Sequence, residues 1–155
     1  MKLVIFGWGN ESRGDDAFGP LLLRRAEALG LTDVTAVEDF QLQIEHALDL
    51  EGADAALFID AGRDTPAPFA FREIAPRFGA THTTHALAPE SVLGVYVQIK
   101  GVAPPPAFAL CVRGESFGLG EGLSSEGAIR LEQAWDFCRE LMAERFFAVW
   151  RGRAV

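Results

Sequence analysis

The chain has 155 residues, 49% hydrophobic and 23% charged, a composition that can fill one core and excludes a disordered chain. Asp and Glu number 22 against 14 Lys and Arg, so the net charge of −8 argues against nucleic-acid or anionic-membrane partners. No apolar run approaches the ~18 residues that span a bilayer, and the first residues have no signal-peptide pattern. Two cysteines are too few for a disulfide scaffold. We expect a single cytoplasmic domain over residues 1–155.

Short apolar runs alternate with stretches of helical period along the first half of the chain. Gly, Pro and Asp at their borders supply the turns and helix ends, and Asp15 or Asp16 is expected to cap the first helix. In chain order we expect a strand at 2–6, a loop at 7–16, a helix at 19–29, a strand at 34–37, a helix at 41–50 and a strand at 55–59.

The second half continues the alternation. Pro66 and Pro68 place the next strand at a sheet edge. In chain order we expect a strand at 69–74, a helix at 89–100, a strand at 107–112, a helix from Ser124 or Ser125 to about Phe147, and a frayed tail at 151–155. The core stripe of the last helix is expected to be Ala128, Leu131, Trp135, Cys138 and Met142. This order predicts an α/β fold: a three-layer sandwich with about five mostly parallel, twisted strands and helices on both faces.

Polar residues able to do chemistry follow several of the expected strands. They are the loop 7–16, Asp60, the run His82-Thr83-Thr84-His85 and the run Arg113-Gly114-Glu115. Because ligands of parallel sheets collect at the carboxyl ends of the strands, we expect these segments to share one edge.

The loop at 7–16 lies between a strand and a helix, as a dinucleotide-binding loop does. However, Gly7-Trp8-Gly9 is followed by Ser12 where that fingerprint needs a third glycine. Asp15 and Asp16 would also repel a pyrophosphate. A Rossmann-like nucleotide-binding module therefore stays only as an alternative.

Two carboxylates and an imidazole from these segments would make an oxygen, oxygen, nitrogen donor set. One aspartate of the Asp15–Asp16 pair can cap a helix while the other points into the cleft, and Asp60 ends a buried apolar run. Such a set suits nickel, zinc, iron or manganese without choosing among them. Cys111 and Cys138 are expected in the core, and His46 at its rim.

Several segments together resemble the [NiFe]-hydrogenase maturation endopeptidases. They are Gly7–Asn10, Gly14–Gly19, Phe58–Ala61, Thr84-His85, Pro89–Leu93 and the stretch from Arg113 to Ser124. The resemblance spans residues 1 to about 141 with matching order and spacing. It implies a five-stranded sheet with helices on both sides, and an enzyme that removes a short C-terminal peptide from the hydrogenase large subunit after nickel insertion.

By motif position, the nickel-recognising residues that the resemblance implies are Asp16, Asp60 and His85, with Asp16 and Asp60 as the catalytic carboxylates. The nickel is expected to arrive on the large-subunit precursor and not to be held tightly by the resting enzyme. Hydrolysis could be metal-assisted or carboxylate-based. Glu115 is a reserve candidate for substrate or metal contact.

The chain departs from the family pattern at two places. Asp16 stands where members of the family have glutamate. Glu38–Gln43 replaces a glycine-rich turn, so the family's substrate recognition at this loop does not carry over directly. The run Asp39–Gln43 looks closer to the branch that serves soluble NAD-linked hydrogenases. A nickel-binding chaperone that holds the large subunit without cutting it is a second alternative. We expect a monomer.

Overall fold

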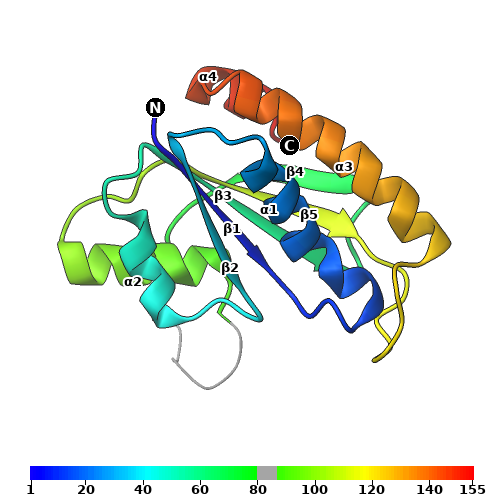
Figure 1. Cartoon of the computed structure of the whole chain (residues 1–155). Helices are drawn as coiled ribbons and strands as arrows, with labels where there is room; N and C mark the ends of the chain where they lie inside the picture. Colours follow the sequence, from blue (N-terminus) through cyan, green and yellow to red (C-terminus); the bar gives the residue numbers. More distant parts are fainter. Residues whose placement is uncertain (80–86) are drawn as a thin grey trace.

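The structure is a computed structural model that describes residues 1–79 and 87–155. A five-stranded sheet with the order β2-β1-β3-β5-β4 lies between helices on its two faces, as Figure 1 shows. The strands are β1 (Leu3–Trp8), β2 (Val34–Asp39), β3 (Ala55–Gly62), β4 (Phe69–Ile74) and β5 (Ala107–Arg113). All neighbouring strands are parallel except β4, which pairs antiparallel with β5 at the sheet edge. The expected fold class is confirmed.

Within the described residues, four α-helices and two short 3-10 helices accompany the strands. They are η1 (Gly14–Ala17), α1 (Phe18–Ala28), η2 (Ile44–Leu50), α2 (Pro89–Lys100), α3 (Ser125–Ala143) and α4 (Phe147–Arg153). No helix in the described ranges is long and apolar enough to cross a membrane.

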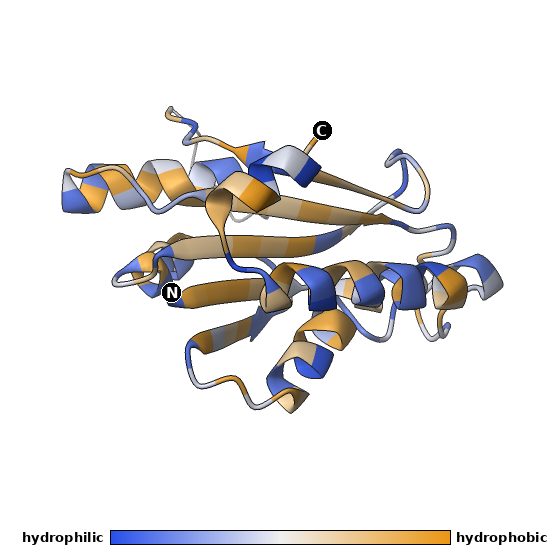
Figure 2. Cartoon of the chain, turned by 90° about the horizontal axis from the view of Figure 1, so that it is seen from above, coloured by the Kyte–Doolittle hydropathy of each residue, from blue (hydrophilic) through white to orange (hydrophobic). Residues whose placement is uncertain are grey.

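The core has two halves because successive side chains of a strand point to opposite faces. On one face Leu57 packs with Leu22 of α1 and Leu131 of α3. On the other, Phe58 packs with Leu50 of η2 and Val92 of α2. Figure 2 shows strands that are mostly hydrophobic along their length, whereas the helices alternate between hydrophobic and hydrophilic residues. Burial on both faces explains why the strands read as continuous apolar runs in the sequence.

The strand order reverses between β1 and β3, which makes this point the switch point of the sheet. α1 starts there in close contact with both strands, because a Cβ on Gly19 would lie 2.4 Å from the Trp8 carbonyl oxygen and 2.9 Å from that of Ile59. Only glycine permits this approach. The loop before α1 is thereby held over the carboxyl ends of β1 and β3, where α/β proteins bind ligands.

Two predictions about the first half were wrong in detail. Neither Asp15 nor Asp16 caps α1, whose N-cap Ala17 makes no side-chain bond, because both aspartates have other partners. The helix expected at 41–50 is the shorter η2, with the Gln43 side chain accepting a bond in a capping box. His46 is buried at 7% exposure and not at the rim, since its ring packs edge-on against Phe6.

The C-terminal part also differs from expectation. Ser124 caps α3 as predicted, accepting a hydrogen bond from the Gly127 N–H, but the helix ends at Ala143. Leu131, Cys138 and Met142 of the expected stripe are buried, whereas Ala128 is exposed. The tail is not frayed: α4 inserts Trp150, and the Val155 N–H donates to the Phe71 carbonyl.

Trp150 anchors this tail, and its truncation should be costly. The side chain is 0% exposed, stands edge-on to Phe108, and donates its indole N–H to the carbonyls of Leu141 and Glu144. We expect Trp150→Ala to lower the free energy of unfolding by about 3–5 kcal/mol, measured by urea denaturation. Ile129→Ala on the exposed face of α3 is the control. Equal midpoints for the two variants would contradict the anchoring role.

Candidate functional site

Asp15 is a buried carboxylate that ties the first loop to the segment before α3. It is 0% exposed and accepts hydrogen bonds from the backbone N–H groups of Glu115 (2.8 Å), Ser116 (3.3 Å) and Ser124 (2.8 Å), and from the Ser124 hydroxyl (2.7 Å). Burial alone would raise the pKa of Asp15, but these donors outweigh it and hold the pKa below its ordinary value. Asp15 therefore acts as a structural clamp that fixes its neighbour Asp16.

Asp16 is the partly buried aspartate of the pair, and it lies at the carboxyl end of β1. The backbone N–H of Asn10 donates to its Oδ2 at 2.7 Å. Gly9, with a φ of 146°, lies so close that a Cβ there would come within 2.0 Å of the Asp16 carbonyl oxygen. The loop thus folds back on Asp16 and fixes the position of one carboxylate oxygen.

Asp60 lies inside β3 rather than after it and pairs in register with Cys111 of β5. Its Oδ1 accepts one hydrogen bond, from the Ala61 N–H at 2.7 Å. Burial raises the pKa of Asp60 to about 7. The hydrogen bond from Ala61 acts in the opposite direction, whereas the nearby charge of Asp16 raises the pKa further. Asp16 is thus near enough for its charge to act on Asp60, although burial is the main cause of the raised pKa.

The third expected ligand, His85, and its neighbour His82 lie outside the described residues. Among residues 1–79 and 87–155, no group of three or more His, Cys, Asp or Glu side chains is arranged to hold a metal ion. What the described residues contribute is a pair of carboxylate oxygen donors, which hard and borderline divalent cations such as nickel accept.

Other candidate residues near this edge of the sheet contact neighbouring side chains. The Glu115 carboxylate, our reserve candidate, is bound by the guanidinium groups of Arg113 (3.2 Å) and Arg130 (2.6 Å). Cys138 is in the core, as expected. Cys111 is only partly buried, and its Sγ lies 3.0 Å from the Thr65 hydroxyl. Its position beside Asp60 was not expected, because the register of β3 against β5 cannot be inferred from one sequence.

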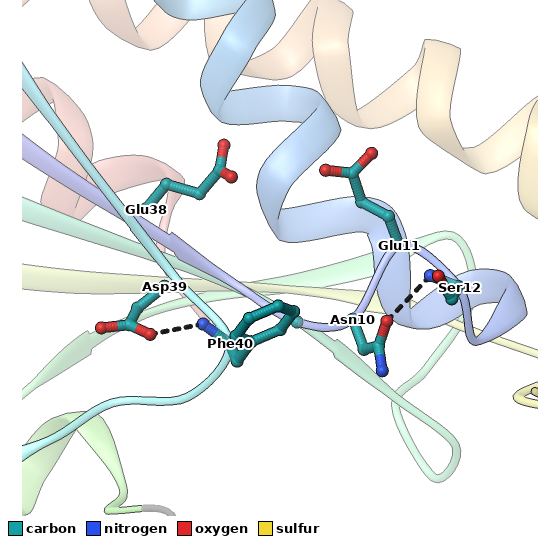
Figure 3. A pocket seen from close by; sticks show the side chains of 7 residues that line it. Asn10, Glu11, Ser12, Glu38, Asp39 and Phe40 are labelled. Carbon is teal, nitrogen blue, oxygen red and sulfur yellow. Dashed lines mark hydrogen bonds between the residues drawn. The ribbon is translucent and has the colours of Figure 1, made fainter.

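A pocket of about 410 Å³ opens between the first loop and the end of β2. It is lined by the first loop and by the end of β2, namely Gly9, Asn10, Glu11, Ser12, Glu38, Asp39 and Phe40 (Figure 3). The sequence analysis expected functional residues on the first loop but not at the end of β2. There, the one indication was that Glu38–Gln43 departs from the family pattern.

The clamp at Asp15 generates a test by mutation and pH. We expect Asp15→Asn to lose about 2–4 kcal/mol of unfolding free energy at pH 7, because its amide NH2 would face hydrogen-bond donors. The folded pKa is lowered, so this stabilisation is fully present above about pH 4 and is lost as the pH falls through the folded value. Urea denaturation at pH 7 and at a pH well below 4 measures this loss. Asp136→Asn, on the exposed face of α3, is the control; an equal loss there would refute the clamp.

Ionisation of Asp60 should change the stability with pH in the opposite direction to that of Asp15. Because its folded pKa is raised, the wild-type protein loses stability as the pH rises from about 4 to about 7. Asn keeps the acceptor for the Ala61 N–H and carries no charge. We expect Asp60→Asn to be about 1–2 kcal/mol more stable than wild type at pH 8 and nearly equal at pH 4. A destabilised variant at pH 8 would show that burial of this carboxylate is not costly.

No protein-family model matches the chain, and no curated protein matches it. Solved structures do. The [NiFe] hydrogenase maturation protease HycI from Thermococcus kodakarensis KOD1 is 25% identical, with a TM-score of 0.69 over 92% of this chain and 93% of that one. The hydrogenase maturating endopeptidase HybD from E. coli is 21% identical, with a TM-score of 0.68 over 94% of this chain and 93% of that one.

HybD from Thermococcus kodakarensis is 17% identical, with a TM-score of 0.69 over 91% of this chain and 99% of that one. The matches cover nearly the full length of both partners, so the likeness extends beyond a shared sheet. They agree with the family resemblance of the sequence, while its assignment to the NAD-linked branch stays a prediction. The chain has the fold of the [NiFe]-hydrogenase maturation proteases, the family that its sequence resembles.

Proposed function

We propose that this chain is an endopeptidase that removes a C-terminal peptide from the nickel-loaded large-subunit precursor of a [NiFe]-hydrogenase. The observation that carries the proposal is the pair Asp16 and Asp60 at the switch point of the sheet. This pair occurs in a chain with the fold of the maturation proteases, 25% identical to HycI. The two residues are the ones that the sequence resemblance assigns to nickel recognition and catalysis.

The resting charge of the pair suits a metal that arrives with the substrate. Near pH 7 Asp60 is about half protonated, which limits repulsion from Asp16. Nickel on the precursor would favour the ionised form, so Asp60 would release its proton on binding. With His85, the two carboxylates would then ligate the substrate's nickel and place the scissile bond in the cleft. A precursor without nickel offers no such ligand and would bind weakly, which makes nickel the recognition element.

Hydrolysis needs a group that takes a proton from the attacking water. A carboxylate whose pKa is about 7 is suited to that task at neutral pH, so Asp60 is the general-base candidate of the carboxylate route. In the metal-assisted route, substrate nickel would lower the pKa of the water, and Asp16 and Asp60 would hold the metal. Both routes require Asp60 in its ionised form at the moment of attack.

The reaction would take place in the cytoplasm, in keeping with two unpaired cysteines.

The direct test is cleavage of the nickel-loaded large-subunit precursor, followed as loss of mass from the precursor. We expect wild type to release the C-terminal peptide and Asp60→Asn to slow the release at least 100-fold, as removal of an acid–base group does. Asp64→Asn, the same chemical change at an exposed position four residues later, is the matched control.

Equal cleavage by wild type and Asp60→Asn would end the assignment of Asp60. Retention of the precursor by wild type without any loss of mass would replace the peptidase by a non-cleaving chaperone.

A further inference from the structure

The loop after β5 lies against the first loop at the carboxyl edge of the sheet (Figure 1). The Asp15 N–H donates to the Ser116 carbonyl at 2.8 Å, and the Gly14 N–H donates to the Glu121 carbonyl at 3.0 Å. A Cβ on Gly14 would lie 2.4 Å from the Ser116 carbonyl oxygen, so the two loops are in direct contact. Phe117 follows Ser116 and therefore stands where the two loops meet.

Phe117 brings together two arginines from different loops. The guanidinium carbon of Arg63 lies 4.5 Å from the centroid of the Phe117 ring, in a cation–π contact. Arg13 Nε donates to the Phe117 carbonyl at 3.5 Å. The ring also packs on Gly114, where a Cβ would lie 2.4 Å from the ring's Cζ. Contact with the backbone thus fixes the ring, and the ring orients the guanidinium of Arg63.

Each of these arginines is close in sequence to one carboxylate of the candidate site. Arg13 precedes Asp16 by three residues, and Arg63 follows Asp60 by three residues. Three residues of chain span at most about 11 Å, which limits the distance from each arginine to its aspartate. A peptide whose scissile bond lies at the two aspartates would therefore have neighbouring residues within reach of the two guanidinium groups.

Arg13 and Arg63 differ from most arginines of this chain because neither is neutralised by a carboxylate. Within residues 1–79 and 87–155, no ion pair joins either side chain to an Asp or Glu, including the exposed neighbour Asp64. Residues 80–86 contain no Asp or Glu at all. The positive charge of both guanidinium groups is thus available to a ligand.

The acidic residues of the two loops are bound to other groups. Two further arginines, 113 and 130, share the Glu115 carboxylate. The Ser116 hydroxyl donates to Glu121, and Asp15 accepts four hydrogen bonds in its buried position. These carboxylates are held by their own partners and leave the two guanidinium groups at Phe117 to a ligand of opposite charge.

We propose that Arg13 and Arg63, gathered at Phe117, form a subsite for a carboxylate of the precursor segment next to the scissile bond. The inference rests on the proposed function for the identity of the partner. Guanidinium groups match the planar carboxylate and bind it with paired hydrogen bonds. The net charge of −8 repels an acidic group elsewhere, so the subsite would fix the position of the segment rather than speed its encounter with the enzyme.

The binding step can be tested without cleavage. Full-length ¹⁵N-labelled protein is titrated with the peptide Ac-Gly-Ala-Glu-Ala-Gly-NH2 and with a version that carries glutamine in place of glutamate. We expect saturable shifts of the Arg13 and Arg63 side-chain Nε–H signals and of the Phe117 amide with the glutamate peptide. The glutamine peptide should bind about fivefold more weakly, the upper end for an exposed ion pair.

A third peptide, Ac-Gly-Ala-Gly-Ala-Gly-OH, distinguishes the two sources of a carboxylate. Tighter binding of this peptide than of the glutamate peptide would assign the subsite to the C-terminal carboxylate of the precursor. Tighter binding of the glutamate peptide would assign it to an acidic side chain. Equal affinity for the glutamate and glutamine peptides together with no binding of the third, or no saturable shift with any peptide, would overturn the proposal.

Variants identify the two arginines as the cause. Arg13→Gln and Arg63→Gln should each weaken the preferred carboxylate peptide about fivefold, because each removes one guanidinium. The matched control is Arg139→Gln, the same change at an exposed arginine of α3 that is paired with Asp136. Unchanged affinity in both loop variants, or an equal loss in the control, would contradict the subsite.

The same variants separate this proposal from the proposed function. With the nickel-loaded precursor, Arg63→Gln should lower kcat/KM about fivefold through a higher KM, because the carboxylate is bound in the ground and transition states alike. Full kcat/KM in both loop variants would remove the subsite from substrate recognition and leave the peptidase intact. Carboxylate binding at Phe117 without cleavage of any precursor by wild type would instead contradict the peptidase.

Discussion

Burial of the Asp60 carboxylate near Asp16 is the constraint on which the candidate site depends. Two partly buried negative charges within reach of each other are costly, and the protein retains them only because the surrounding fold fixes both. Asp60 is held within β3, in the middle of a parallel sheet. Asp16 is held by the loop after β1, which the buried neighbour Asp15 ties to the start of α3. The two adjacent aspartates thus differ, because Asp15 is buried and structural whereas Asp16 is only partly buried.

Much of this arrangement could be predicted from the sequence. Continuous apolar runs such as residues 55–59 indicate strands that are buried on both faces, and their alternation with helical stretches determines the fold class. In parallel sheets the carboxyl ends of the strands share one edge, so Asp16 and Asp60 were expected together although 44 positions separate them in the sequence. Ser124 or Ser125 was expected as a cap from its place before an apolar helical stripe, and Ser124 is the residue that caps α3.

The remaining features depend on contacts between distant segments. Asp15 was interpreted as a possible cap of its own helix, because nothing in the local pattern shows that its partners lie 100 to 109 residues away. The C-terminal tail was expected to fray, because the burial of Trp150 depends on its contacts with Phe71 and Phe108, which are far away in the sequence. The pocket at Phe40 likewise joins two loops that are apart in the sequence, and an exposed phenylalanine in a turn has no distinctive pattern of its own.

The most direct test of the account is the titration of Asp60, followed by its side-chain ¹³C carboxyl shift in wild type and in Asp16→Asn. The account predicts that Asp60 titrates with a pKa of about 7 in wild type and at a lower value once the charge at position 16 is removed. The same pKa of Asp60 in wild type and in Asp16→Asn would show that the two carboxylates do not converge.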